Sequence, residues 1–259
     1  MRLVHVAATS IFGSTEQKGS TEMTGPLDKQ PRTILLIGAS RGLGHAMAVE
    51  FTKKGWHVVG TVREDGRTEL NELADAHPDQ VTIECLDITE RAQIAALRDR
   101  FSDSVFDILF VNAGTTNHDQ AETIAETSTD EFVRVMVTNA LGVMRTVEGL
   151  QDLVRPTGLI GVMSSGQASI ADNEKGGHEV YRGSKAALNQ YMRSYAARHV
   201  GDERALVLMA PGWVRTELGG PEARFSIEET IPELVDTLVK QQGTRGLRFI
   251  DRHGKSIPW

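Results

Sequence analysis

Residues 34–55 read ILLIGASRGLGHAMAVEFTKKG, and they place a strand signal, a glycine-rich turn and a helix signal in direct succession. ILLIG (34–38) is an unbroken apolar run, which is typical of a strand buried on both faces. HAMAVEF (45–51) has helical spacing, and Gly55 follows its end. The turn between them contains Gly38, Gly42 and Gly44. This succession predicts the first unit of a nucleotide-binding α/β fold.

The same alternation continues along the chain. Further strands are predicted at 57–62, 81–87, 107–114, 158–165 and 205–212, and further helices at about 91–101, 129–153, 179–200 and 228–241. Strands buried on both faces that alternate with helices form a parallel sheet covered on both sides. We therefore predict a doubly wound α/β fold of the Rossmann type, with a single domain over residues 31–259.

Residues 1–30 differ from the rest in being polar and rich in Gly, Ser and Thr, with little periodicity. Such a composition predicts a disordered N-terminal tail. Two alternatives stay open, a targeting peptide within residues 1–12 and a true start at Met23.

Composition excludes several classes of function. The chain has 259 residues with 28 Lys and Arg against 35 Asp and Glu, a net charge of −7, which argues against a nucleic-acid or anionic-membrane surface. Its single cysteine, Cys85, forbids an intrachain disulfide, favours a cytoplasmic location and is expected in the core. The eight histidines lack the spacing of a metal site, so no metal is expected. No apolar run approaches the roughly 18 residues of a membrane span.

The glycine turn has the spacing G-x3-G-x-G. Glycines let the backbone approach a ligand closely, and the N-terminus of the following helix offers N–H groups to a pyrophosphate. A turn that only connects strand to helix is the alternative. Because ligands bind at the carboxyl ends of strands in such sheets, the position of this turn favours nucleotide binding.

Two arginines predict which nucleotide is bound. At the end of the second strand, where NAD-binding folds hold the ribose with a carboxylate, the chain has Val62 followed by Arg63. Arg41 lies within the glycine turn, and two guanidinium groups suit a 2′-phosphate. NADP(H) is therefore expected over NAD(H). Solvated surface arginines are the alternative, and Glu64 and Asp65 would compete with the phosphate for both.

The stretch EVYRGSKAALNQYMRSYAARHV (179–200) predicts an amphipathic helix. Its apolar stripe is expected to contain Leu188, Tyr191, Met192, Tyr195, Ala196, His199 and Val200. Tyr181 and Lys185 fall on the same stripe. Since a lysine is rarely buried without a partner, this pair points to a site.

These motifs resemble those of the short-chain dehydrogenase/reductase family. IGASRGLG (37–44) is similar to its TGxxxGxG loop, VNAG (111–114) to its NNAG element, and APGWVRTELGG (210–220) to its PG segment on the nicotinamide side. Its catalytic tetrad is matched by Asn139, Ser165, Tyr181 and Lys185. The motifs keep the family's order over residues 32–259.

The resemblance implies an NADP-dependent oxidoreductase that moves a hydride between nicotinamide and a carbonyl or alcohol substrate. Tyr181 would be the acid/base, its pKa lowered by Lys185 and a cationic nicotinamide, while Lys185 also bonds the ribose hydroxyls. Ser165, with Ser164 as the alternative, would hydrogen-bond the substrate oxygen. Asn139 would hold a water that relays protons to Lys185.

The cofactor-binding residues expected on the combined ground of motif and resemblance are Gly38, Ser40, Arg41, Gly42, Leu43, Gly44, Arg63, Asp87, Ile88, Asn112, Ala113, Gly114, Tyr181, Lys185, Pro211, Gly212, Val214 and Thr216. Asp87 is expected either at the adenine edge or in a turn. Thr216 is expected at the carboxamide. Since the family commonly pairs its long fourth and fifth helices, a homodimer or homotetramer is implied.

A narrower resemblance connects SSGQASIADN, PGWVRTELGG and the terminal GKSIPW to the C-factor-like and sniffer-like carbonyl reductases. The chain departs from the family at Ile37, where a threonine hydroxyl would brace the turn, at Val111, and at 166–168, which lacks a usual glycine. Two other functions remain as alternatives. They are a nucleotide-binding signalling protein of C-factor type with little turnover and a sugar-nucleotide epimerase, whose loop would read G-x-x-G-x-x-G.

Overall fold

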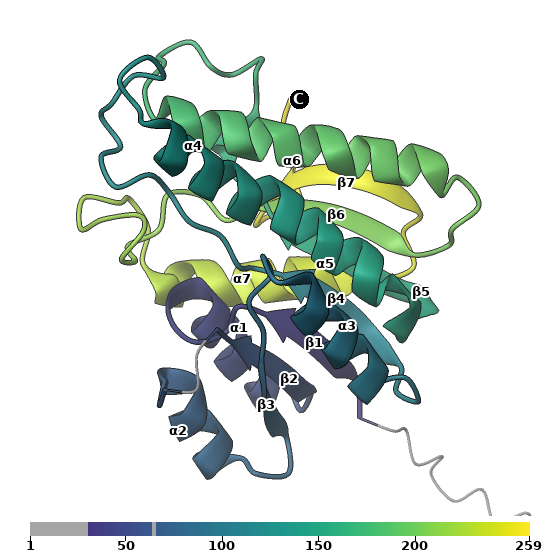
Figure 1. Ribbon diagram of the computed structural model, residues 1–259. Coiled ribbons are helices and arrows are strands. Elements are labelled where there is room, and N and C mark those ends of the chain that lie inside the picture. The colour runs from purple at the N-terminus through teal and green to yellow at the C-terminus, as the bar shows by residue number, and fades with distance from the viewer. Residues whose placement is uncertain (1–30, 64–65) are drawn as a thin grey trace, which may run out of the picture. The chain divides into compact units, whose positions relative to one another are not determined.

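The apolar runs of the sequence become the strands of one parallel sheet in the computed structural model, which describes residues 31–63 and 66–259. Within these residues the strands are β1 (Thr33–Ile37), β2 (His57–Val62), β3 (Val81–Cys85), β4 (Phe106–Val111), β5 (Val154–Met163), β6 (Ala205–Ala210) and β7 (Gly246–Asp251). Their order is β3-β2-β1-β4-β5-β6-β7 (Figure 1). The chain changes direction across the sheet between β1 and β4, the place where such folds bind ligands. The predicted tail, residues 1–30, lies outside the described residues.

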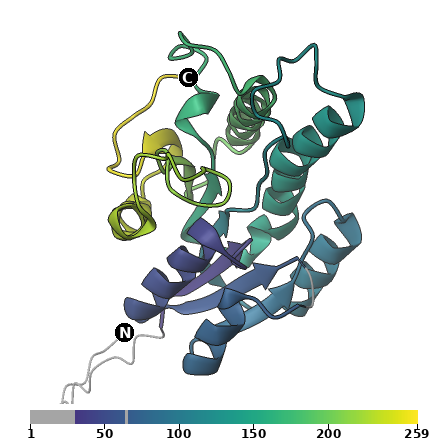
Figure 2. The same ribbon diagram turned by 90° about the vertical axis from the view of Figure 1, so that its left-hand side faces the viewer.

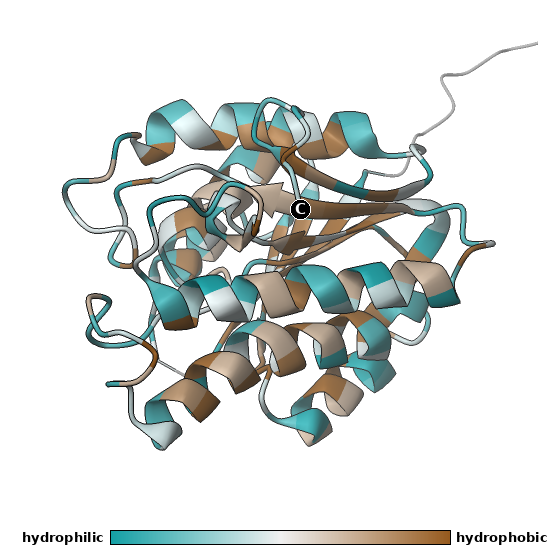
Figure 3. Ribbon diagram, turned by 90° about the horizontal axis from the view of Figure 1, so that it is seen from above, coloured by the Kyte–Doolittle hydropathy of each residue, from teal (hydrophilic) through white to brown (hydrophobic). Residues whose placement is uncertain are grey.

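Helices cover both faces of this sheet. They are α1 (Gly42–Lys53), α2 (Glu69–Ala76), α3 (Arg91–Arg100), α4 (Thr129–Met136), α5 (Val143–Leu150), α6 (Glu179–Arg198) and α7 (Ile227–Gln241), with short turns of helix η1 (Val137–Gly142), η2 (Gln151–Leu153) and η3 (Gly166–Ala168). The apolar strands form the middle layer between the helices in Figure 3. The predicted doubly wound α/β fold is therefore confirmed.

The unbroken apolar run of β1 is explained by two separate hydrophobic cores. Leu35 and Ile37 contribute to the core under α3, α5 and α6, whereas Ile34 and Leu36 contribute to the core under α1 and α7. Neighbouring residues of a strand point to opposite faces. A strand covered on both faces must therefore be apolar at every position.

The loops that follow the strands collect at one end of the sheet, which faces the viewer in Figure 2. The loop after β1 enters α1, the loop after β5 leads to α6, and the loop after β6 leads to α7. The predicted site residues lie in these loops and at the starts of the helices that follow, so the fold brings them to one end.

Several sequence-based expectations were wrong in detail. The helix α2 at residues 69–76 was not predicted, and the predicted helix 129–153 is interrupted by η1, a π-helix. On α6, Tyr191 is 46% exposed and Val200 lies beyond the end of the helix at 88% exposure. Cys85 is exposed rather than in the core, because it ends β3, the strand at the edge of the sheet. Among the described residues, no helix has both the length and the apolar character needed to cross a bilayer.

Candidate active site

The glycine turn after β1 is held from both neighbouring strands. Gly38 N donates to Thr61 Oγ1 on β2 at 2.9 Å, and Asn112 Nδ2, just after β4, donates to Gly38 O at 2.8 Å. The hydroxyl that Ile37 lacks is thus supplied by Thr61, which is buried. A Cβ at Gly44 would lie 2.0 Å from Gly38 O, so only glycine fits there. The turn is therefore a backbone cradle, held to β2 by Thr61 and to the end of β4 by Asn112.

The start of α1 is suited to an anionic group. Gly42 adopts φ 58°, a conformation that favours glycine. The first turn of α1 contains no acidic residue, and within the described part of the chain no side chain caps the N-terminus of α1. The orphan N–H groups at a helix start attract anions such as phosphate. Ser40 and Leu43 are half-buried beside them, and Arg41 projects into solvent.

An ion pair connects this turn to the loop after β6. Arg41 Nη1 lies 3.0 Å from Glu217 Oε2, and both side chains are largely exposed. Thr216, the neighbour of Glu217, accepts a hydrogen bond from Gly219 N at 3.0 Å, and its methyl group lies near Gly42. Thr216 is therefore beside the glycine turn, where a residue that contacts the cofactor would have to be.

Tyr181 and Lys185 lie on the inner side of α6, above the end of β5. Lys185 is 3% exposed, and its Nζ donates to Met163 O at 2.9 Å. Nζ also lies 5.8 Å from the ring centre of Tyr181. The buried ammonium of Lys185 therefore has the carbonyl of Met163 as a partner. The sequence had suggested only the ribose hydroxyls of a cofactor.

Of the two candidate serines, Ser165 is the one beside Tyr181. The hydroxyl of Ser165 lies close enough to Tyr181 to act on its ionisation, and it lowers the pKa of Tyr181. Ser164 faces away from them, is 2% exposed and donates to Asn189 Oδ1 at 2.7 Å. Because neighbouring residues at a strand end point in opposite directions, only one of the two can reach Tyr181.

Burial alters the ionisation of both groups on α6. It raises the pKa of Tyr181, an effect that the hydroxyl of Ser165 opposes. It lowers the pKa of Lys185 to about 8. The sequence-based expectation of a lowered Tyr181 pKa is therefore wrong for the protein alone, because desolvation disfavours the phenolate more than its neighbours favour it. That the positive charge of a bound nicotinamide lowers the pKa of Tyr181 stays a prediction.

Asn139 is buried in the π-helix η1 and braces the loop after β4. Its Oδ1 accepts from Thr115 N at 2.8 Å, and its Nδ2 donates to Thr115 O at 2.7 Å and to Ser184 Oγ at 2.9 Å. Both amide protons are thereby used, so the side chain joins the loop to α6. The π-helix itself is a feature frequent at functional sites. The water-holding role of Asn139 stays a prediction.

The remaining predicted cofactor residues surround the same end of the sheet. Asp87 Oδ1 accepts from Thr89 N and Thr89 Oγ1, which is the turn role left open by the sequence. Ala113 packs against Gly38, and Gly114 lies beside Lys185 and Asn139. In the other loops, Ile88, Pro211 and Val214 are buried. Gly212 has φ 92°, a conformation that favours glycine. Arg63 follows the end of β2 and is exposed.

Sequence reasoning missed four residues that shape this site, namely Thr61, Asn189, Glu217 and Arg252. Arg252 donates to Pro211 O at 3.2 Å and stacks 3.9 Å from the centre of the Phe225 ring, which fixes the loop after β6. No local pattern marks these residues, because each contacts a partner far away in the sequence. In the described ranges no three His, Cys, Asp or Glu side chains gather as metal ligands would.

Comparisons with known proteins agree with this geometry. A family model described as enoyl-(acyl carrier protein) reductase matches residues 38–235. A Burkholderia multivorans structure described as a short-chain dehydrogenase/reductase with bound NADP is 63% identical, covers 88% of this chain and all of its own, and has a TM-score of 0.87.

Two further relatives bear on the alternatives. A carbonyl reductase from Pseudomonas aeruginosa PAO1 in complex with NADP is 31% identical, with a TM-score of 0.82 over 88% of this chain and all of its own. The C-signal protein of Myxococcus xanthus is 30% identical over 155 residues, which are 59% of this chain and 92% of that protein. With its fold, its glycine cradle and the Ser165–Tyr181–Lys185 arrangement at the end of the sheet, the chain belongs to the short-chain dehydrogenase/reductase family.

Proposed function

We propose that the protein is an NADP-dependent oxidoreductase that reduces carbonyl groups or oxidises the corresponding alcohols. The observation that carries this proposal is the contact between Ser165 and Tyr181 beside the buried ammonium of Lys185. Bound NADPH would supply the hydride. The protein must then supply a proton and hold the developing charge on the substrate oxygen.

Each polar group of this arrangement has a task in that reaction. Tyr181, kept protonated by burial, donates its proton to the carbonyl oxygen. Ser165 donates a hydrogen bond to the same oxygen, where negative charge develops. Lys185, whose pKa is near 8, carries a positive charge that favours the phenolate formed once the proton has left. In the direction of oxidation the same groups act in reverse.

The residues present fit the nucleotide. The glycine cradle would hold the pyrophosphate against the start of α1, since side chains at Gly38 and Gly44 would collide with neighbouring atoms. Arg41 and Arg63 would bind the 2′-phosphate, because Val62 leaves no carboxylate to repel it. The Burkholderia multivorans and Pseudomonas aeruginosa proteins with bound NADP support the same cofactor.

A second candidate function is signalling without appreciable turnover. The similarity to the C-signal protein favours it. The presence of all four tetrad residues, Asn139, Ser165, Tyr181 and Lys185, favours an enzyme instead. The epimerase is disfavoured by the spacing of the glycine turn.

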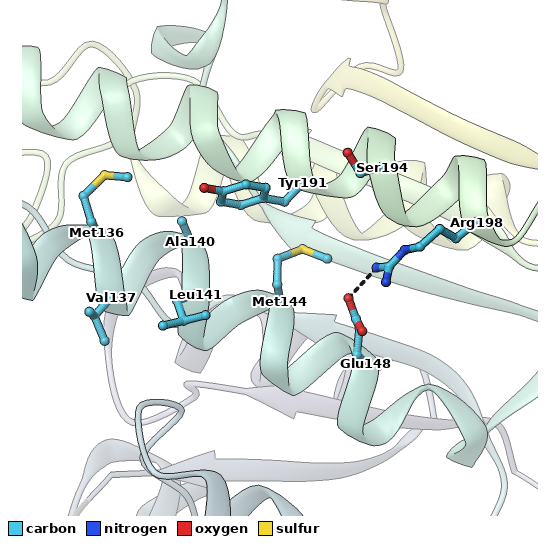
Figure 4. A pocket seen from close by; sticks show the side chains of 9 residues that line it. All are labelled: Met136, Val137, Ala140, Leu141, Met144, Glu148, Tyr191, Ser194 and Arg198. Atoms are coloured by element: carbon cyan, nitrogen blue, oxygen red, sulfur yellow. Dashed lines mark hydrogen bonds and ion pairs between the residues drawn. The ribbon is translucent and has the colours of Figure 1, made fainter.

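We also propose that the protein forms a homodimer or homotetramer through α4, α5 and α6. A groove of about 430 Å³ runs between these helices (Figure 4), and the ion pair between Glu148 and Arg198 closes one end of it. Exposed apolar residues lie on the same side of the molecule, Phe132 and Val133 on α4, Leu141 on η1 between α4 and α5, and Tyr191 on α6. Apolar surface of this kind is typical of an interface. As its single cysteine suggests, we place the protein in the cytoplasm.

The function is tested by following NADPH oxidation with a panel of aldehydes, ketones and quinones. At least one carbonyl compound is expected to be reduced. Tyr181→Phe should keep the fold and bind NADPH, yet turn over at least ~10²-fold more slowly, because only the proton donor is removed. A parent protein that binds NADPH but reduces no member of the panel would favour the signalling alternative.

A further inference from the structure

Three side chains of α6, spaced four residues apart, contact three successive residues at the end of β5. Lys185 donates to Met163 O, and Asn189 accepts from Ser164 Oγ. Tyr181 lies beside Ser165, which lowers its pKa. Residues spaced by four lie on one side of a helix. The two reactive members of this row are therefore accompanied by a third contact, that of Asn189 and Ser164, which the proposed reaction does not use.

The contact between Asn189 and Ser164 is buried. Their exposed fractions are 3% and 2%, and the hydrogen bond measures 2.7 Å. Asn189 Nδ2 is also buried and has no hydrogen-bond partner among the described residues. An unpaired buried donor costs stability, so this pair contributes less to folding than two apolar side chains of similar shape would. Stability is a poor reason for a polar pair at this place.

The place of Ser164 in the chain gives a better explanation of its hydrogen bond to Asn189. Ser164 is the residue directly before Ser165, and its N–H makes the last backbone hydrogen bond of this segment to β6, to Met209 O at 2.8 Å. Beyond this point the backbone continues into η3, whose start is Ser165 itself. The backbone of Ser164 is thus held by β6, and Ser165 Oγ accepts from Gln167 N at 3.1 Å, but neither bond fixes Ser165 relative to α6. The bond to Asn189 ties the backbone beside Ser165 to the helix that carries Tyr181.

We propose that Asn189 and Ser164 are positioning residues, which hold Ser165 beside Tyr181 and at hydrogen-bonding distance from the substrate oxygen. The proposal rests on the proposed reductase function. It adds a requirement to that function, because an oxyanion-type hydrogen bond acts only when its donor is already in place. Both residues are buried, and the proposed reaction gives neither of them a contact with substrate or cofactor.

The test uses Ser164→Ala, Asn189→Leu and the double variant. Each single variant leaves one buried polar group unpaired and should melt at a lower temperature. The double variant removes both groups and should melt close to the parent. All three should reduce the carbonyl substrate roughly 2- to 10-fold more slowly, which is the range for one misplaced hydrogen bond. The KM for NADPH should change little, because Lys185 keeps its bond to Met163.

A second readout separates positioning from a merely structural role. The hydroxyl of Ser165 opposes the rise in the Tyr181 pKa, so a displaced Ser165 lets that pKa rise further. Reduction needs protonated Tyr181. The basic limb of the kcat profile should therefore move to higher pH in the double variant.

Thr52→Val is the matched control. Thr52 is 5% exposed, and its hydroxyl donates to Ala48 O at 2.8 Å within α1, at the end of that helix away from the site. It should alter stability without altering kcat or its pH profile. An active parent whose double variant keeps the parental kcat and pH profile would overturn the positioning role alone. A parent without turnover would overturn the proposed function and the positioning role together.

Discussion

Arg41 and Glu217 form an ion pair of 3.0 Å between the glycine turn and the loop after β6. Both residues are exposed, so the pair itself contributes little to folding. The ion pair matters because Glu217 competes with the 2′-phosphate of NADP for Arg41. The guanidinium that would bind the 2′-phosphate of NADP is neutralised by a carboxylate of the same chain, and the phosphate must displace that carboxylate or share the arginine with it.

Glu217→Gln should therefore strengthen the binding of NADPH. Release of an exposed ion pair is worth up to about 1 kcal/mol, which corresponds to a decrease in Kd of up to roughly fivefold. The Kd of NADH, which lacks the 2′-phosphate, should stay the same. Isothermal titration with both nucleotides measures the two values. Equal changes for both would mean that Glu217 acts on the loop and not on Arg41.

Arg63→Ala should weaken NADPH binding far more than NADH binding. A charge-assisted hydrogen bond is worth about 1.5 to 3 kcal/mol, so the apparent KM for NADPH should rise about tenfold or more. Added salt should reduce the preference of the parent protein for NADPH, because the arginines are exposed and screening weakens their attraction. Steady-state kinetics at two ionic strengths check both statements. A parent that uses the two cofactors equally would contradict them.

Thr61→Val should loosen the glycine turn. Val keeps the shape of Thr but leaves Gly38 N without its acceptor at 2.9 Å, and such a loss costs about 1 kcal/mol of unfolding free energy. The KM for NADPH should rise as well, since the turn is the proposed pyrophosphate site. Urea unfolding and kinetics measure the two effects. Thr82→Val, at an exposed position on β3, serves as control and should show neither.

Lys185→Met should make the protein more stable at pH 7 while abolishing turnover. Burial lowers the pKa of Lys185 from 10.5 to about 8, so the folded protein pays for holding the charged form below pH 8. This cost is on the order of 3 kcal/mol, reduced by the bond to Met163, and it shrinks as the pH rises from 8 to 10.5. The stability gained by Met should shrink over the same interval. Thermal unfolding of parent and variant at pH 7, 9 and 10.5 measures it, and a gain independent of pH would contradict the lowered pKa.

The sequence by itself determined the fold class and the order of most of the elements, with α2 and β7 as the exceptions. Strands covered on both faces need an apolar residue at every position, as in Ile34 to Ile37, and this pattern is visible in the chain without its partners. The capping box of α7 is local in the same way, because Ser226 and Glu229 are three residues apart. The family followed from motifs of the same short range.

Only the tertiary structure decided how the site is held together. Ser165 and Ser164 are equivalent in sequence, and the packing of α6 on β5 turns one toward Tyr181 and the other toward Asn189. The exposure of Tyr191 depends on where α5 lies, and the pairing of Arg41 with Glu217 depends on two loops that meet only at the end of the folded sheet. Contacts of this kind join residues far apart in the chain. Local periodicity does not encode them, because it records which face a residue lies on and not which partner that face meets.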